Sequence, residues 1–220
     1  MLVYIFDLDD TLYPVNTIDE SVGLPIYNAL KQLNLLNQRY TVDQINEIYS
    51  LCWKYPIDEL AKRFNFPNVF LTEISEVYQN LTVNHKLQTF PDYNIINNLE
   101  GDKYLVSTGY PNLQTSKIEN LGIKDNFIDI YFDNPISKPR KTKKYFMNLI
   151  YNKYKIDPNC FIVVGDNLHS EILYANELKM TSVLFNIRNY SNKHFIESNT
   201  NPTFIINNLS ELQNLNISKW

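Results

Sequence analysis

The sequence is poor in cysteine, and it has no internal repeat and no long low-complexity tract. Only Cys52 and Cys160 occur, far apart in the chain, so they can form neither a disulfide framework nor a zinc-binding cluster. We expect both to be small apolar residues in a reducing compartment.

An excess of positive charge is also absent. The 20 Lys and Arg residues against 24 Asp and Glu residues give a formal net charge of -4, so neither nucleic acid nor an anionic membrane is an expected partner. The apolar run at residues 2–6 ends at Asp7 without basic residues before it, unlike a signal peptide or a transmembrane segment. We therefore expect a cytoplasmic protein.

Two kinds of periodicity divide the 220 residues. From about 15 to 90 the pattern is helical, with a capping box at Thr41 and Gln44 and a regular helix expected to begin near Pro25. From 91 onward apolar strands near 104–108, 128–133, 161–166 and 181–186 alternate with amphipathic helices. Continuous apolar strands joined by helices predict a parallel sheet covered on both faces, so the helical region is an insertion after the first strand.

Asp7 and Asp9 come directly after that first apolar strand. Because strand side chains alternate between faces, the two carboxylates begin on the same side, where they repel unless a cation or a shared proton intervenes. This arrangement suits a divalent metal, with one carboxylate attacking and the other moving protons.

The pattern D-x-D-x-T at residues 7–11 resembles motif I of the haloacid dehalogenase (HAD) superfamily of phosphohydrolases. Residues 104–109 resemble motif II, Lys138 with Pro139 resembles motif III, and residues 161–166 followed by Glu171 resemble motif IV. The resemblance implies an α/β fold with a Rossmann-like, doubly wound parallel sheet and an inserted all-helical cap. It places the catalytic core at residues 1–14 and 91–220 and the cap at 15–90.

By this resemblance Asp7 is the nucleophile that forms an aspartyl-phosphate, and Asp9 protonates the leaving alkoxide and then deprotonates water. Asp9 argues against the dehalogenase branch, whose displacement of halide needs no proton donor. The resemblance also implies Mg²⁺, held by Asp7, Asp166 and the backbone carbonyl of Asp9. Glu171 replaces the family's usual second aspartate, and we expect it to act on a metal-bound water or on Lys138 rather than on the metal itself.

Thr108, Gly109 and Lys138 are the expected phosphate-binding residues. The Thr108 hydroxyl and the closely approaching backbone at Gly109 suit a phosphoryl oxygen, with Ser107 as the competing hydroxyl. Lys138 supplies positive charge to the transferring group. The basic residues that follow it are interpreted as a solvated helix face: Arg140, Lys141, Lys143 and Lys144.

The substrate expected from these motifs is a small phosphate ester. Residues 10–14 resemble the branch that contains pyrimidine 5′-nucleotidases, which favours a nucleoside 5′-monophosphate, while sugar phosphates and phosphoglycolate stay open. Trp53 and Tyr55 are candidates for stacking on a base, although aromatics at helical spacing more often belong to a core. His169 is expected at the surface, and no oligomeric state is predicted.

Two alternatives belong to other functional classes. A signalling receiver also combines acidic groups, Thr, Lys and Mg²⁺ on a doubly wound sheet, but its phosphoacceptor lies on a later strand and it lacks an inserted cap. A non-hydrolytic phosphate-binding protein on the same fold is disfavoured by the intact set of motif residues.

Overall fold

A six-stranded sheet with the order β3-β2-β1-β4-β5-β6 forms the centre of the protein, and every neighbouring pair of strands is parallel. The structure, a computed structural model, describes residues 1–191 and 198–215. The strands are β1 (Val3–Phe6), β2 (Asp102–Thr108), β3 (Asp129–Asp133), β4 (Phe161–Gly165), β5 (Thr181–Phe185) and β6 (Phe204–Ile206). The expected doubly wound α/β fold is confirmed.

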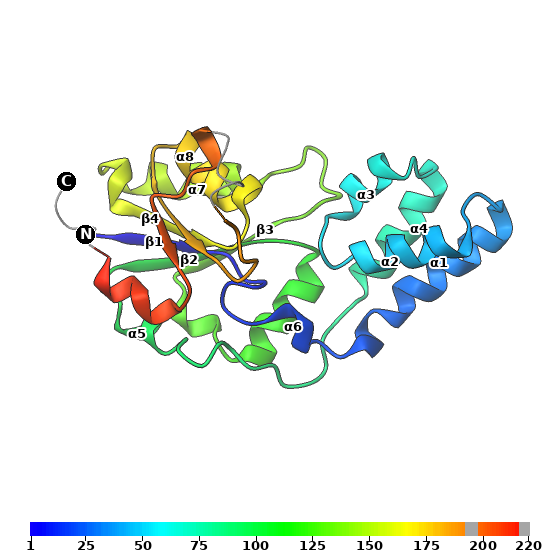
Figure 1. Cartoon of the computed structure of the whole chain (residues 1–220), viewed down its shortest axis with the longest axis horizontal. Helices are drawn as coiled ribbons and strands as arrows, with labels where there is room; N and C mark the ends of the chain where they lie inside the picture. The colour runs from blue at the N-terminus through cyan, green and yellow to red at the C-terminus, as the bar shows by residue number, and fades with distance from the viewer. Residues whose placement is uncertain (192–197, 216–220) are drawn as a thin grey trace.

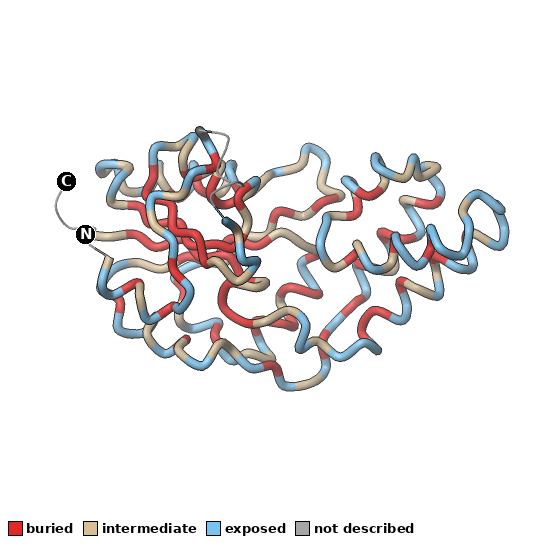
Figure 2. Tube along the Cα trace, in the orientation of Figure 1, coloured by how far each residue is buried: buried red, intermediate tan, exposed pale blue. Residues whose placement is uncertain are grey.

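The first strand lies in the middle of the sheet, and all four of its residues are buried (Figure 2). Tyr4 and Phe6 join the core on one face of the sheet, whereas Val3 and Ile5 join the core on the other. An uninterrupted apolar strand is what burial on both faces requires, because alternate side chains enter different cores.

Helices cover both faces of the sheet, α5 and α6 on one and α7 and α8 on the other (Figure 1). Their bounds are α5 (Ile95–Asn98), α6 (Pro111–Leu121), α7 (Lys143–Tyr154) and α8 (Leu173–Glu177). The helix α6 ends at Gly122, which has a left-handed conformation (φ 69°) that a residue without a side chain adopts readily.

Four further helices lie together at one end of the molecule (Figure 1). They are α1 (Leu24–Asn37), α2 (Val42–Leu51), α3 (Ile57–Arg63) and α4 (Asn68–Gln79). We call this group, residues 24–79, the helical insertion. The capping box is confirmed, because the Thr41 hydroxyl accepts from the backbone N–H of Gln44 while the Gln44 side chain accepts from that of Thr41. Edge-to-face contacts of Phe70 with Tyr40 and Phe66 fill its interior.

The chain runs along α6 before it re-enters the sheet. Ser116 Oγ accepts a hydrogen bond of 2.8 Å from the backbone N–H of Val83, and the carbonyl of Asn120 accepts one of 3.2 Å from Leu87. These residues precede the predicted boundary at 91, so part of the predicted cap packs on the core; the domain boundaries themselves stay a prediction. Residues 192–197 and 216–220 of the predicted core lie outside the described residues.

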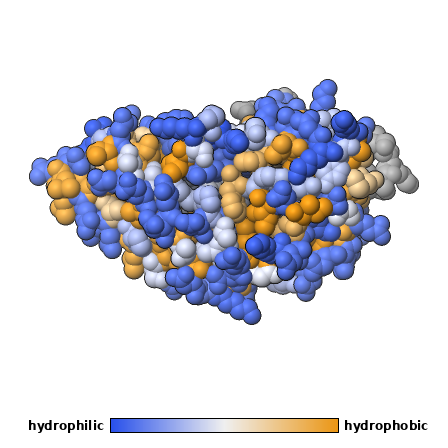
Figure 3. Space-filling model, turned by 180° about the vertical axis from the view of Figure 1, so that it is seen from behind, coloured by the Kyte–Doolittle hydropathy of each residue, from blue (hydrophilic) through white to orange (hydrophobic). Residues whose placement is uncertain are grey.

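Parallel strands bring their carboxyl ends to one edge of the sheet, where ligand sites of open α/β sheets form. Asp7 follows β1, Thr108 and Asp133 end β2 and β3, and Asp166 follows β4. Seen from behind, the surface carries apolar patches among hydrophilic residues (Figure 3). Among the described residues, no helix has both the length and the apolar character to span a membrane.

Candidate active site

A cleft of about 370 Å³ lies between the carboxyl edge of the sheet and the helical insertion. The core side is lined by Asp7, Asp9, Thr108 and Asp166, and the insertion contributes the segment from Cys52 to Ile57. Its volume falls within the range of small-molecule sites, roughly 300 to 1,000 Å³.

The contacts of the insertion with the core include a stacked pair, an ion pair and a hydrogen bond of 2.6 Å from Asn112 Nδ2 to the carbonyl of Gln79. Tyr78 of α4 stacks on Tyr110 with ring centroids 4.9 Å apart. Arg140 Nη1 lies 2.5 Å from Asp58 Oδ2 of α3, while the same guanidinium binds Asp133 at the end of β3. The stacked pair and the ion pair join residues that line the cleft or adjoin it, so they fix its present width.

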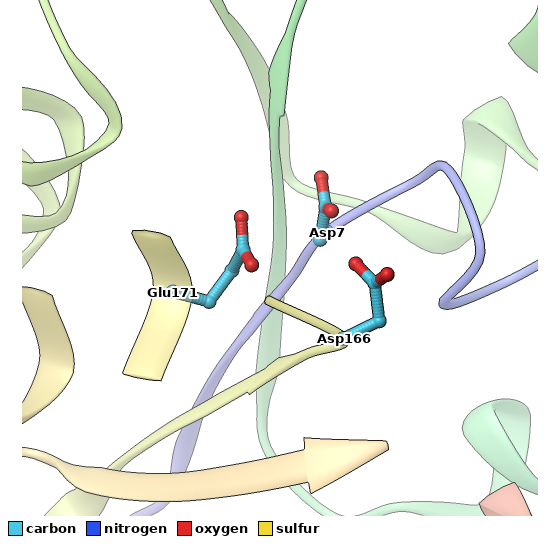
Figure 4. A group of neighbouring side chains, drawn as sticks. All are labelled: Asp7, Asp166 and Glu171. Carbon is cyan, nitrogen blue, oxygen red and sulfur yellow. The ribbon is translucent and has the colours of Figure 1, made fainter. Parts of the chain in front are cut away.

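Three buried carboxylates meet at the floor of the cleft. Oxygens of Asp7, Asp166 and Glu171 lie within 4.8 Å of one another, and the three side chains are directed toward the same space (Figure 4). Oxygen donors at this separation suit a hard divalent cation. Asp7 and Asp166 were predicted as metal ligands, whereas Glu171 was expected farther away and instead lies inside the cluster.

A π-helical turn, Leu168–Ile172, carries Glu171 into this position. Gly165 makes room for it, because a Cβ at that position would overlap the Glu171 side chain. The Glu171 carboxylate accepts hydrogen bonds from the backbone N–H of Asn167 (3.2 Å) and from the Ser170 hydroxyl (2.9 Å). Turns of this kind concentrate at functional sites because they redirect a side chain without ending a helix.

The positive charge beside Asp7 comes from Lys143, and this corrects the prediction that Lys138 supplies positive charge at the site. Lys143 Nζ lies 2.6 Å from Asp7 Oδ1 and also contacts Glu171, and its side chain is only 4% exposed. Lys138 is exposed and does not line the cleft. The lysine at the first turn of α7 therefore occupies the place that the Lys-Pro motif was expected to fill.

The sequence does hold a signal for Lys143 that the charge-run interpretation overlooked. Lys143, Met147 and Ile150 are spaced for one helical face, and all three are buried in α7. Arg140 was likewise interpreted as solvated but is an ion-pair partner of Asp133 and Asp58. The sequence pattern of residues 142–154 also predicts Tyr145 and Leu149 on the apolar face of this helix, but they are 45% and 38% exposed.

Negative charge exceeds positive charge in the acidic cluster. Among the described residues, its three carboxylates form ion pairs with two cations. Lys143 contacts Asp7 and Glu171, and Arg188 contacts Asp166. Burial, together with Glu171, raises the pKa of Asp166 to about 7. Burial also raises the pKa of Asp7 well above its ordinary value, despite the opposing effect of Lys143. Carboxylates held close together in this way fit a divalent cation, because it would relieve both their desolvation and their repulsion.

Asp9 has a different environment, made by residues that the sequence reasoning missed. Its carboxylate accepts hydrogen bonds from Lys117 Nζ at 2.9 and 3.0 Å, from Gln114 Nε2 at 3.1 Å and from the Tyr13 hydroxyl. Burial alone would raise the pKa of Asp9, but these donors, Lys117 foremost, hold it below its ordinary value. Lys117 and Gln114 were undetected because their partner is about a hundred residues away in the chain.

Thr108, the last residue of β2, and Gly109, which follows it, both line the cleft. The Thr108 hydroxyl donates to Asp133 Oδ2 at 3.3 Å, while the competing Ser107 hydroxyl accepts from Gln114 at 2.6 Å. Gly109 has φ 154°, and a Cβ there would lie 2.8 Å from the Gln114 side chain. A glycine is therefore needed both for the backbone conformation and for the placement of Gln114.

The two candidate stacking aromatics differ in freedom. The Trp53 indole and the Tyr49 hydroxyl both lie close to Gly23, where an added Cβ would be 2.9 and 2.6 Å from them. Tyr55 is 44% exposed, and both residues line the cleft. His169 is exposed at the rim, as expected.

The raised pKa of Asp166 predicts how metal-free stability depends on pH. The folded protein holds this proton up to about pH 7, whereas an unfolded aspartate releases it near pH 4, at about 3.9. The folded state thus binds more protons in this window, so the Asp166 contribution to the free energy of unfolding falls as pH rises from about 4 to 7. Mg²⁺ bound at this cluster would compete with that proton, so we expect Mg²⁺ to raise Tm by several degrees more at pH 8 than at pH 5.

Thermal unfolding of the wild type and of Asp166→Asn, each with and without Mg²⁺, checks this prediction. The asparagine variant cannot take up that proton and should lose most of the pH dependence of the Mg²⁺ shift. An equal Mg²⁺ shift at both pH values in the wild type would contradict the linkage.

The sequence matches the family model of haloacid dehalogenase-like hydrolases over residues 1–177. No curated protein sequence matches the chain.

Several solved structures have the same fold. A candidate HAD-hydrolase, YfnB from Bacillus subtilis, bound to magnesium, superposes with a TM-score of 0.60 at 17% identity, covering 97% of each chain. A 2-haloacid dehalogenase from Pseudomonas syringae pv. Tomato gives 0.58 at 20% identity, again over 97% of both chains. A candidate phosphatase from Clostridium difficile gives 0.63 at 16% identity over 96% of both. At these identities the likeness establishes the fold alone.

Proposed function

The chain belongs to the haloacid dehalogenase-like hydrolases, and from this premise we propose that it is a Mg²⁺-dependent phosphomonoesterase acting through an aspartyl-phosphate. The observation that carries the proposal is the presence of two different carboxylates at one cleft. Asp7 belongs to the buried acidic cluster, whereas Asp9 stands outside it among hydrogen-bond donors. One carboxylate can attack while the other handles protons.

Asp7 is the proposed nucleophile. Its attack on phosphorus would expel the alcohol and form an acyl phosphate, which water then hydrolyses, so one difficult displacement becomes two easier ones. Magnesium, held by Asp7, Asp166 and Glu171 or by a backbone carbonyl at Asp9, would supply charge screening between the carboxylate and the phosphate. Lys143 would stabilise the negative charge on the transferring group from its position 2.6 Å from Asp7.

Asp9 is the proposed acid and base. Its lowered pKa suits the second step, in which a carboxylate accepts a proton from the attacking water. A phosphate dianion bound beside it would raise that pKa again, because a second negative charge disfavours the ionised carboxyl. The protonated form can then donate to the departing alkoxide. Thr108 and the backbone at Gly109 would bind the phosphoryl oxygens.

Two features, the Asp9 carboxylate and the helical insertion, distinguish a phosphatase from the alternative functions. A dehalogenase needs no proton donor at the position of Asp9, although dehalogenases share the fold. A receiver would not need an insertion over its phosphoacceptor, yet here the insertion lines the cleft. A phosphatase accounts for both features.

For the substrate we propose a small phosphorylated metabolite, with a nucleoside 5′-monophosphate as the first candidate and sugar phosphates and phosphoglycolate as alternatives. The supporting feature is an exposed Tyr55 on the insertion side of the cleft, opposite the carboxylates of the core. An aromatic ring there can stack on a base.

Phosphate release from these three classes of ester, with Mg²⁺ and with EDTA, tests the proposed function. We expect turnover of at least one class that stops on chelation. Failure to release phosphate from any ester, including p-nitrophenyl phosphate, would refute it, and a single stoichiometric phosphorylation without turnover would favour a receiver.

Tyr55→Ala tests the nucleotide assignment. Loss of base stacking should raise KM for nucleoside monophosphates by an amount equivalent to about 1 to 3 kcal/mol, roughly 5- to 150-fold. Because p-nitrophenyl phosphate has no nucleobase, its KM should change little, and Tyr55→Phe should retain nucleotide binding. Parallel losses on both substrates would show that Tyr55 does not contact a base.

A further inference from the structure

We propose that Lys117 of α6, assisted by Gln114, is a positioning residue that holds Asp9 in the orientation needed for proton transfer to the leaving group. The inference rests on the proposed function, since it concerns the acid of that reaction. It assigns a role to a buried lysine that the motifs of the sequence do not include.

The contacts fix both oxygens of Asp9. Lys117 Nζ donates to Oδ1 at 2.9 Å and to Oδ2 at 3.0 Å. The Tyr13 hydroxyl adds a second contact to Oδ1, and Gln114 Nε2 adds one of 3.1 Å to Oδ2. A carboxylate that accepts hydrogen bonds at both oxygens cannot rotate without breaking several of them at once.

Because Lys117 is buried, its charge has to be balanced by Asp9 rather than by solvent. Its side chain is 3% exposed, whereas that of Asp9 is 30% exposed and open to the cleft. In the described part of the chain, Asp9 is the partner in the ion pair of Lys117. Because a buried ammonium without a nearby acidic group is strongly disfavoured, Lys117 and the Asp9 carboxyl are held together by the fold.

Helix α6 supplies both donors from one face. Gln114 and Lys117 are three residues apart and therefore adjacent on the helix. Gln114 is itself anchored, since Nε2 also donates to Ser107 Oγ at 2.6 Å, and the missing side chain at Gly109 leaves it space. The orientation of Asp9 is thus set from the core, independently of the helical insertion that meets the leaving group.

The consequence concerns the leaving group. An alkoxide needs a proton as the P–O bond breaks, and a misplaced acid cannot deliver it; a p-nitrophenolate leaves without one. Removing Lys117 should therefore slow the transfer of the phosphoryl group from alkyl esters and spare its transfer from aryl esters. A merely structural role would reduce both rates alike.

The test compares glycerol phosphate with p-nitrophenyl phosphate as substrates. Single-turnover rapid quench isolates transfer of the phosphoryl group to Asp7 from the later hydrolysis step, in which Asp9 also takes part. We expect Lys117→Met to lower the rate constant of transfer from glycerol phosphate by about 100-fold, the scale of a misplaced catalytic group, and that from p-nitrophenyl phosphate by no more than a few-fold. The substrate concentration that gives half the maximal transfer rate should change little for both. Lys117→Arg, which keeps the charge and the donors, should recover much of the loss. Lys124→Met, an exposed lysine just beyond the same helix, is the matched control and should behave as the wild type.

A double variant provides a second test of the proposal if Lys117→Met folds poorly. Asp9→Asn and Asp9→Asn/Lys117→Met should have equal activities on glycerol phosphate, because a lysine that acts through Asp9 has no effect once that carboxyl is gone. Equal losses on both substrates in Lys117→Met or in Lys117→Arg, or additive losses in the double variant, would overturn the inference. If the wild type released phosphate from neither ester, the proposed function itself would fail, which is a distinguishable result.

Discussion

Asp7→Asn is expected to abolish phosphate release, with a loss of at least about 10⁴-fold in kcat, the scale on which removal of a nucleophile is felt. The amide keeps the shape of the side chain but lacks the negative charge that makes a carboxylate oxygen nucleophilic toward phosphorus. Burial and two acidic neighbours already disfavour the ionised Asp7 in the folded state, so the variant should remain folded. Phosphate release under saturating Mg²⁺ measures the effect.

The control for Asp7→Asn is a measurement of its folding rather than of a second activity. Asp7→Asn should show a cooperative thermal transition near that of the wild type and should trap no phosphoenzyme in a rapid quench with labelled substrate. Turnover at the wild-type rate would exclude Asp7 as the nucleophile and with it the covalent mechanism.

Lys143→Met is expected to have the second largest effect, a fall in kcat of about 10²- to 10³-fold, typical of removing one group that stabilises transition-state charge. Lys143 contacts both Asp7 and Glu171, so the variant also leaves two buried carboxylates unpaired. Breaking a buried pair typically costs about 3 to 5 kcal/mol of the free energy of unfolding. Added Mg²⁺ should restore part of that stability.

Lys138→Met is the matched control for this prediction, because Lys138 lies five residues earlier on the exposed loop. It should retain activity and stability close to those of the wild type, as measured by kcat and by Tm. A large loss of kcat in Lys138→Met with little change in Lys143→Met would reinstate the motif-based assignment and contradict the geometry of the cleft.

The difference between these two lysines shows where sequence reasoning stopped. The Lys-Pro pair at 138 and 139 predicted Lys138 at the phosphate site. Which lysine reaches the site depends, however, on how the loop after β3 joins α7. Burial of Lys143 on the same helical face as Met147 and Ile150 places its side chain under the carboxyl edge of the sheet. A charged residue on an otherwise apolar helical face was the available signal, and the surrounding basic residues obscured it.

The order of secondary structure was determined by the sequence alone. Uninterrupted apolar strands such as Val3–Phe6 can be stable only between two covered faces, and the helical periodicity of residues 15 to 90 could not supply further strands. The same logic placed Asp7, Asp9, Thr108 and Asp166 at one edge, because each ends a strand of a parallel sheet or follows its end within three residues.

The tertiary structure alone decided which groups surround those carboxylates. Glu171 enters the cluster because a π-helical turn and Gly165 let it pass, and Lys117 reaches Asp9 across 108 residues. Ion pairs and hydrogen bonds of this kind join segments that are adjacent only after the sheet and α6 have packed. Periodicity predicts which face of an element is buried, but it does not predict which charged atom of another element lies opposite. The charges around each carboxylate of the site can therefore be identified only in the folded chain.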